Sequence, residues 1–268
     1  MIVRLHVAYD GTQYHGWQAQ PEARTVEGEI TKAAAEILDQ PAEEVKIQGA
    51  SRTDAGVHAL GQVAHLIHDR ERSVWEFARG LNALTPDDIC INRVEEAPDD
   101  FHARYSAEGK TYRYRIWNHR FQHPLEHRRM WRFKYHLSEK RMKQAAERMV
   151  GTHDYSAFRA ADCDSPRSEC TIRRVDVEFD EPEITITVEG ISFLKYMVRV
   201  MAGTLVEIST GHAPPDLVDR LFESGDRHQA GVTAPACGLT LVEVDYPDFP
   251  WEGTPPEPGT PALAKWCE

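Results

Sequence analysis

The sequence SRTDAGVHALGQVAHL, Ser51 to Leu66, joins a glycine-containing turn to an alternating strand, and the elements around it decide the fold. Asp54 and Gly56 suit a turn, because an aspartate can bond its own backbone two residues on and glycine tolerates a positive φ. A plain turn is therefore the first interpretation. Arg52 changes the balance, since a guanidinium within reach of a carboxylate keeps that carboxylate ionised and oriented. Together Arg52 and Asp54 indicate a prepared nucleophile or base.

The elements on both sides of this turn follow a β-α-β-β-α-β order. Alternating residues predict strands, and Thr25 is a typical N-cap before apolar residues at helical spacing. The expected elements are strands at 2–9, 46–51, 62–68 and 89–95 and helices at 26–39 and 74–84. This order is that of the ferredoxin-like split unit, an antiparallel sheet with helices on one face.

A second round of similar elements follows in the rest of the chain. Strands are expected at 110–118, 171–179, 184–189 and 239–246, helices at 139–150 and 193–208, and an added short helix at 215–224. Composition and charge sign change in PDDFHARYS, so we place a boundary there and expect subdomains at 1–103 and 104–247. The remaining residues, 248–268, are rich in proline and glycine and receive no catalytic role. The pattern predicts an α+β protein.

Size and cysteine usage limit the class of protein. A chain of 268 residues can bury a core without metals or disulfides. Its five cysteines, at 90, 163, 170, 237 and 267, are odd in number and scattered, which suits a reducing cytosol. The six residues between Cys163 and Cys170 are not a usual zinc-ligand spacing, so no metal is expected. The sequence contains no apolar run near the roughly 20 residues of a membrane helix. We expect a cytoplasmic protein with no membrane partner.

The charge of the chain is unevenly distributed. The formal net charge is −12, which argues against indiscriminate binding of polyanions. Residues 102–136 nevertheless carry nine Lys or Arg against two Glu, a local balance of +7, and aromatic residues are interleaved with them. A surface of this kind can hold phosphates and stack bases. Solvated strand faces and core aromatics are the alternative, and an acidic body with one basic face fits a selective RNA binder.

Seven blocks of the sequence, in order, resemble the TruA family of tRNA pseudouridine synthases, and the match runs from Tyr9 to Pro247. They are YDGTQYHGWQ (9–18), SRTDAGVHALGQVAHL (51–66), LNALTPDDI (81–89), FHARYSAEGKTYRYRI (101–116), GTHDYSAF (151–158), FLKYMVRVMAGTL (193–205) and PACGLTLVEVDYP (235–247). One motif can match by chance. Seven in the family's order identify the chain as similar to that family.

The resemblance carries expectations about fold, reaction and partners. It implies a pseudouridine synthase fold, in which two ferredoxin-like subdomains have antiparallel sheets that join around a central cleft. It implies the isomerisation of uridine to pseudouridine at positions 38 to 40 of the anticodon stem-loop of tRNA, without a cofactor. A homodimer is also implied, because one anticodon arm is long compared with a subunit of this size.

The same resemblance assigns roles to single residues. Asp54 matches the essential catalytic aspartate, which attacks the base, attacks the sugar or removes a sugar proton. Arg52 fills the space left by the flipped base or forms a salt bridge with Asp54. Tyr112 stacks on the uracil and takes part in proton transfer, or is a buried core tyrosine. Arg199 pairs with Asp54 if its helix faces the cleft. The expected catalytic set is Asp54, Arg52, Tyr112 and Arg199, and the expected substrate-binding set is Tyr112, Arg52, Lys110, Arg113 and Arg115.

Two departures from the family pattern and two other classes of function remain. Ser51 stands where glycine is common, and Lys195 with Tyr196 replaces a more usual aromatic or histidine pair. We expect this lysine to adjust phosphate contacts. A non-catalytic tRNA-binding module would need the basic face but not Asp54. A carboxylate hydrolase of small glycosides would require a second acid near Asp54, and the sequence offers no convincing partner.

Overall fold

The structure is a computed structural model that describes residues 1–68 and 73–246 of the chain. The predicted tail at 248–268 lies outside the described residues. One hydrophobic core cluster runs through both halves of the described chain, from Ile2 to Val244. None of the helices described is long and apolar enough to cross a membrane.

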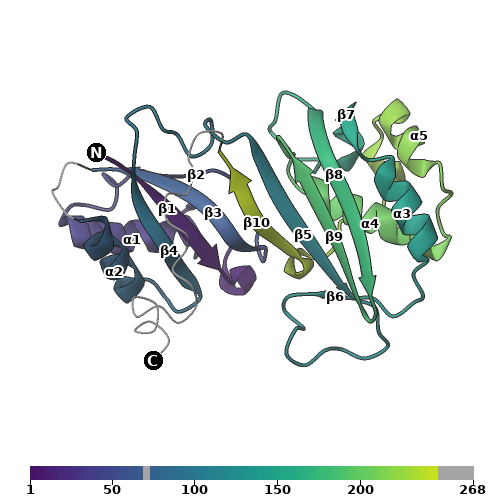
Figure 1. The fold of residues 1–268 in the computed structure, drawn as a ribbon, viewed down its shortest axis with the longest axis horizontal. Helices are drawn as coiled ribbons and strands as arrows, with labels where there is room; N and C mark the ends of the chain where they lie inside the picture. The colour runs from purple at the N-terminus through teal and green to yellow at the C-terminus, as the bar shows by residue number, and fades with distance from the viewer. Residues whose placement is uncertain (69–72, 247–268) are drawn as a thin grey trace.

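A single sheet of ten strands forms the backbone of the described residues (Figure 1). Its main path has the order β4-β1-β3-β10-β5-β9-β8-β7, while β2 pairs with β3 and β6 with β5. All pairings are antiparallel except β10 with β3 and β5 with β6. The strands are β1 (Ile2–Tyr9), β2 (Ile47–Gly49), β3 (His58–Ile67), β4 (Ile89–Ala97), β5 (Gly109–Trp117), β6 (Trp131–Arg132), β7 (Gly151–Asp154), β8 (Glu169–Asp180), β9 (Glu183–Gly190) and β10 (Leu239–Asp245). The predicted α+β class is confirmed.

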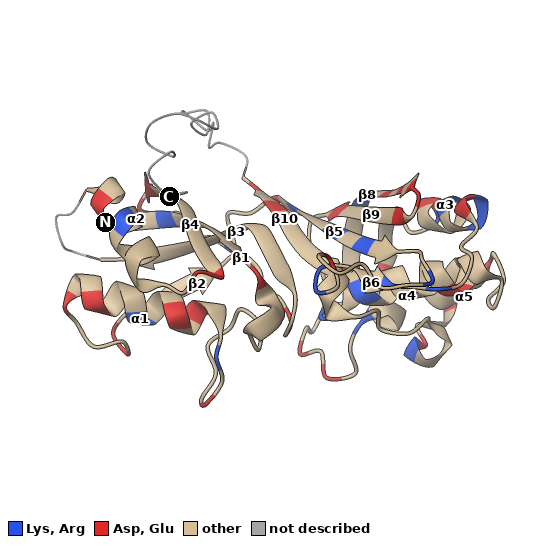
Figure 2. Ribbon diagram, turned by 90° about the horizontal axis from the view of Figure 1, so that it is seen from below, with Lys and Arg blue, Asp and Glu red and all other residues tan. Residues whose placement is uncertain are grey.

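The helices are α1 (Val26–Leu38), α2 (Val74–Leu84), α3 (Glu139–Glu147), α4 (Met197–Thr210) and α5 (Leu217–Ser224). In Figure 2, α1 and α4 lie on the same side of the sheet, at its two ends. Thr25 caps α1 by accepting a hydrogen bond from the Gly28 N–H, as its sequence position predicts. Ser73 and Glu76 form a capping box at α2, which explains why that helix has its predicted bounds.

The strands of the first and second halves of the chain meet at β3 and β10. This junction consists of two residue pairs, Thr240 with His58 and Leu241 with Ala59. On its other side, β10 pairs with β5 along most of its length. The residues that follow Asp54 in sequence therefore enter the sheet directly beside the second half.

Three differences from the sequence prediction bear on the site. The strand predicted from residue 62 begins at His58, so the loop that carries Asp54 is short. The helix predicted from residue 193 begins at Met197, because Tyr196 has a left-handed conformation with φ of 66°. Lys195 therefore lies before the helix, whereas Arg199 lies in its first turn. β6 and β7 are short strands that the sequence did not predict.

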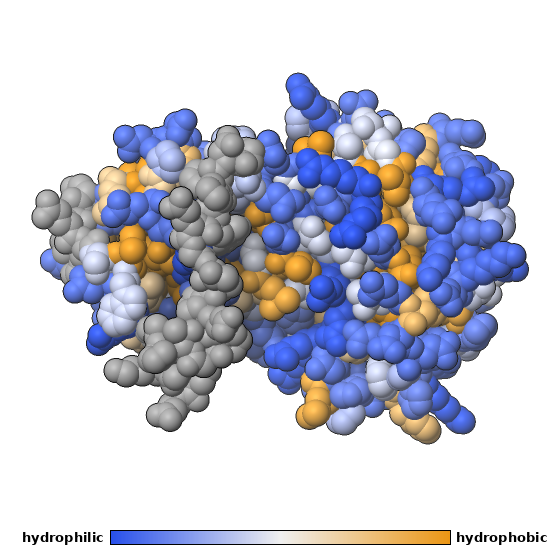
Figure 3. Space-filling model, viewed as in Figure 1, coloured by the Kyte–Doolittle hydropathy of each residue, from blue (hydrophilic) through white to orange (hydrophobic). Residues whose placement is uncertain are grey.

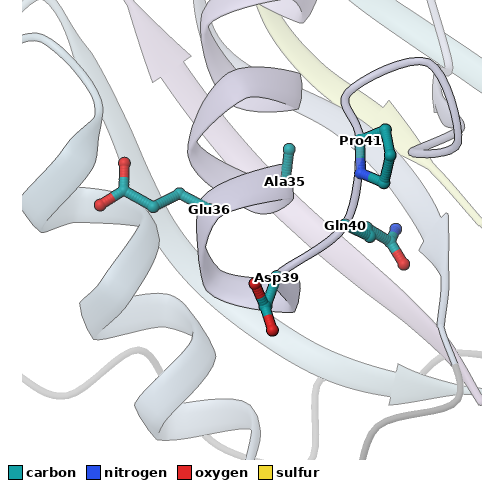
Figure 4. A pocket seen from close by; sticks show the side chains of 5 residues that line it. All are labelled: Ala35, Glu36, Asp39, Gln40 and Pro41. Carbon is teal, nitrogen blue, oxygen red and sulfur yellow. The ribbon is translucent and has the colours of Figure 1, made fainter.

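The sheet face away from α1 and α4 is the one turned to the viewer in Figures 1 and 3. Figure 3 shows it to be mostly hydrophilic over the second half of the sheet. A wide groove of about 1110 Å³ crosses it and is lined by charged residues of both signs. A second, shallow hollow lies at the C-terminal end of α1, between Ala35 and Pro41 (Figure 4). Neither is lined by Asp54.

Candidate active site

The loop that carries Asp54 is anchored to the sheet by a buried glutamine. Gln62 of β3 is fully buried, and its amide group bonds the backbone of Ser51 twice. Its Nε2 donates to the Ser51 carbonyl at 2.7 Å, and its Oε1 accepts from the Ser51 N–H at 3.3 Å. These bonds fix the start of the loop, and the Val57 N–H, which donates to the Asp54 carbonyl at 3.1 Å, closes the turn.

The amino-terminal segment YDGTQYHGWQ packs against the same loop. The Trp17 N–H donates to the Thr53 carbonyl at 3.1 Å, and the Tyr9 and Thr53 hydroxyls lie 2.7 Å apart. Glycine is required at position 11, since a Cβ there would lie 1.9 Å from the Val57 carbonyl oxygen. Trp17 and Tyr9 are buried. This segment therefore supports the Asp54 loop.

Arg199 of α4 forms an ion pair with Asp54, as expected for a helix that faces this carboxylate. The distance from Arg199 Nη1 to Asp54 Oδ2 is 3.2 Å, and the two side chains are only 13% and 17% exposed. Arg199 Nε also donates to the Ala234 carbonyl at 2.8 Å, which fixes the guanidinium plane. Residues 145 positions apart in sequence thus meet at one carboxylate.

Burial decides the protonation behaviour of Asp54. Desolvation raises the pKa of its carboxyl group above the ordinary value. Arg199 opposes this by charge and by its hydrogen bond, and Lys195 opposes it by charge, while the charge of Asp162 adds to the rise. A partly desolvated carboxylate with one fixed cation is less well solvated, and so more reactive as nucleophile or base, than an exposed one.

Tyr112 of β5 lies beside this pair. Its hydroxyl is 2.7 Å from the Ser51 hydroxyl, and its ring makes an edge contact with Phe193 at 4.9 Å between centroids. Burial raises the pKa of Tyr112 to about 12, with a contribution from the charge of Asp54. The side chain is buried, as the alternative interpretation of a core tyrosine requires, yet its hydroxyl reaches the loop of Asp54.

Arg52 does not pair with Asp54 among the residues described. Arg52 is exposed. Its positive charge opposes the rise that burial causes in the pKa of Glu27, at the start of α1. The predicted salt bridge between Arg52 and Asp54 is therefore wrong, because Arg199 of α4 pairs with the carboxylate instead. The other hypothesis, entry of Arg52 into the stack of an RNA, needs an exposed side chain.

The three basic residues of β5 are divided between the two faces of the sheet. Lys110 shares the face of Tyr112, and burial together with the charge of Arg104 lowers the pKa of Lys110 to about 8. Its ammonium group forms no ion pair within residues 1–68 and 73–246. Arg113 and Arg115 line the groove on the opposite face, where Arg115 is bound to Glu126 and Glu183. The structure does not bring those two arginines to Asp54.

Several residues that position the site were not predicted. Gln62, Ser51 and the carbonyl of Ala234 give no sequence signal, because their roles depend on which segments the fold brings together. His58 is buried, accepts from the Gly11 N–H at 3.1 Å and lies 3.0 Å from the Arg128 carbonyl. Within the described parts of the chain, no three His, Cys, Asp or Glu side chains gather as metal ligands.

Comparison with known proteins addresses the resemblance directly. A family model described as tRNA pseudouridine synthase matches residues 5–106 and 145–247. The chain belongs to the tRNA pseudouridine synthase family. This confirms the resemblance to TruA and makes the protein an isomerase, so the interpretation as a non-catalytic binding module is not needed.

Curated relatives agree over nearly the whole chain. A protein named tRNA pseudouridine synthase A from Acetivibrio thermocellus is 44% identical over 91% of this chain and 99% of its own length. Relatives of the same name from Geotalea uraniireducens and Vibrio parahaemolyticus are 44% and 38% identical, covering 91% and 92% of this chain and 99% and 93% of their own lengths. A solved Cbf5-Nop10-Gar1 complex covers 89% of this chain and 57% of that chain at 12% identity, with a TM-score of 0.34, which is too weak to support an argument.

Proposed function

We propose that this protein isomerises uridine to pseudouridine at positions 38 to 40 of the tRNA anticodon arm, with Asp54 as the essential carboxylate. The observation that carries the proposal is the ion pair of Asp54 with Arg199, formed beside Tyr112. Family membership supports the reaction class, and the partly buried carboxylate supplies a group able to act on a glycosidic bond.

The reaction needs the base–sugar bond broken, the base turned and a carbon–carbon bond formed. No electron or energy source is consumed in this exchange, so the protein groups must supply position, charge and proton transfer. Asp54 acts in its ionised form, and Arg199 keeps it ionised and oriented. Tyr112 offers a ring face for the uracil, and its hydroxyl stays bonded to the Ser51 hydroxyl of the Asp54 loop.

The target uridine must leave its stack before Asp54 can reach it. We propose that Arg52, which is exposed, enters the vacated space and compensates for the lost stacking. Lys110 lies on the same strand face as Tyr112 and would bind a phosphate on the same side of the sheet. Arg113 and Arg115 lie on the opposite face, so in this proposal they do not contact the target nucleotide.

The two halves of the chain each fit a ferredoxin-like subdomain. The strand pairings give the orders β4-β1-β3-β2 and β10-β5-β9-β8, and helices follow the first and third strands of each half in sequence. We propose a boundary between residues 103 and 104 and a cleft between the halves that holds the anticodon arm. We also propose that the protein is cytoplasmic and forms a homodimer. Sedimentation of the purified protein tests the dimer directly.

The decisive experiment maps pseudouridine nucleotide by nucleotide in an unmodified tRNA transcript with uridines through the anticodon arm. Wild type is expected to modify positions 38 to 40 without added cofactor. Asp54→Asn, nearly isosteric, and Asp54→Ala are expected to bind the transcript and modify nothing. Modification by either variant would remove Asp54 from its proposed role, and modification only at other positions would overturn the assigned substrate site.

A further inference from the structure

A second ion pair lies beside the proposed active site, on the residues that lead into α4. Lys195 Nζ is 2.6 Å from Asp162 Oδ2, and the two side chains are 39% and 72% exposed. The Ala160 N–H also donates to the Lys195 carbonyl at 2.9 Å. The segment containing Asp162 is therefore joined to the start of α4 by one backbone bond and one exposed ion pair.

This pair is electrostatically connected with Asp54. The ammonium group of Lys195 lies 5.5 Å from the ring centroid of Tyr196, and the guanidinium of Arg199 lies 4.6 Å from the same centroid. Two cations thus lie close to one ring, and one of them holds Asp54. Lys195 and Asp162 also act on the pKa of Asp54 in opposite directions. The exposed pair is part of the surroundings of the reacting group.

The ion pair is easily exchanged. An exposed ion pair of this kind favours its paired state over the separated state by no more than about fivefold. Water and salt screen the attraction, and both side chains lose conformational freedom when they pair. A backbone phosphate of RNA carries a full negative charge and gains further by releasing condensed counterions when a lysine neutralises it. A carboxylate on an exposed loop therefore competes poorly with a phosphate that arrives at the same ammonium group.

We propose that Lys195 binds a backbone phosphate of the RNA next to the target nucleotide, and that Asp162 occupies this position in the free protein. The inference rests on the proposed function and adds a phosphate site to it. Because the contact is with the backbone, it contributes to affinity and register in every RNA substrate and reads no base. Binding of RNA turns the Asp162 carboxylate out to solvent.

The test uses Asp162→Asn, Lys195→Gln and the double variant, with unmodified tRNA under single-turnover conditions at several salt concentrations. We expect Asp162→Asn to lower the half-saturating protein concentration about two- to fivefold. Lys195→Gln should raise it and reduce the slope of log affinity against log salt by about one phosphate contact. In the Lys195→Gln background, Asp162→Asn should have no further effect.

The matched control is Glu139→Gln, which removes one negative charge and breaks the exposed pair with Lys143 on α3, also 2.6 Å long. Glu139→Gln should leave the half-saturating concentration unchanged. If it lowers that concentration as much as Asp162→Asn does, the change in net charge alone explains the effect. An unchanged salt slope in Lys195→Gln, or an equal gain from Asp162→Asn with and without Lys195, overturns the phosphate site. Absence of modification by wild type refutes the proposed function instead, so the two failures are distinguishable.

Discussion

Removal of Arg199 is the perturbation whose size the structure best defines. At 3.2 Å between Nη1 and Oδ2, Coulomb's law with an effective dielectric of about 20 sets a ceiling of about 5 kcal/mol. Truncation of one partner in a largely buried charge pair ordinarily costs about 2–5 kcal/mol. Both side chains keep some contact with solvent, so we take the lower part of that range, about 2–3 kcal/mol. Arg199→Ala should then lower kcat/KM at neutral pH by roughly 30- to 150-fold.

The direction of the expected change in the pH dependence of kcat/KM follows from the pKa of Asp54. Burial already raises the pKa of Asp54, and Arg199 is the largest influence that opposes this rise. Without the guanidinium, the protonated and inactive form of Asp54 persists to higher pH. The acid limb of kcat/KM must therefore move to higher pH in Arg199→Ala, and part of the lost activity should return in alkaline buffer.

The assay follows pseudouridine formation in the unmodified transcript from pH 5.5 to 9. Arg199→Lys keeps the charge but not the bond from Nε to the Ala234 carbonyl, so its acid limb should lie between those of wild type and Arg199→Ala. Arg148→Ala breaks an exposed ion pair with Asp219 and should behave as wild type. An acid limb in Arg199→Ala that coincides with that of wild type would refute the electrostatic role of Arg199.

Three further predictions concern groups around the same loop. Tyr112→Phe should reduce kcat/KM about fivefold, because the lost bond to Ser51 is worth about 1 kcal/mol. Neither pH limb should move, since the pKa of about 12 keeps the phenol protonated. A loss beyond a hundredfold contradicts this prediction. Gln62→Ala should cost about 2–4 kcal/mol of unfolding free energy and lower Tm by about 5–15 °C in a circular dichroism melt. Gln48→Ala, at an exposed position of β2, should leave Tm unchanged. Because the pKa of Lys110 is about 8, tRNA affinity measured by filter binding should weaken from pH 7 to pH 9. Lys110→Arg should remove that pH dependence, since an arginine stays charged. An equal pH dependence in the variant counts against Lys110 as a phosphate ligand.

Much of the fold was predictable because local signals agree with it. The bounds of β1 and α2 follow from strand alternation and from the capping residues Ser73 and Glu76. The late start of α4 was not predictable, since a left-handed Tyr196 is disfavoured by itself and is held only by its surroundings. The short strands β6 and β7 exist because neighbouring strands offer free edges, which no local pattern records.

The site divides in the same way. Asp54 and Tyr112 were found from a turn motif and from the resemblance, which name positions but not partners. Sequence proximity indicates Arg52 as a partner of Asp54, and this prediction is wrong. Arg199, which the resemblance raises as a partner, lies 145 positions away and meets the carboxylate through packing. Strand alternation alone separates Tyr112 from Arg113 on β5, and the structure places Arg113 in the groove and Tyr112 at the Asp54 loop. Alternation did not say which face would meet Asp54.

The arrangement of contacts at Asp54 links catalysis to the junction between β3 and β10. The carboxylate is carried by the loop before β3, Tyr112 by β5 on the other side of β10, and Arg199 by α4. Only two residue pairs join β3 to β10, so few backbone bonds fix the distance between Asp54 and the groups that act with it. Ala236 lies close to Gly56, since a Cβ at position 56 would be 3.3 Å from the Ala236 Cβ. The hydrogen bond from Arg199 to the Ala234 carbonyl further ties α4 to this segment. A substitution that loosens the segment from Ala234 to Gly238 should therefore increase the distance between Arg199 and Asp54. We expect it to reduce the rate of pseudouridine formation without removing any group that touches the substrate.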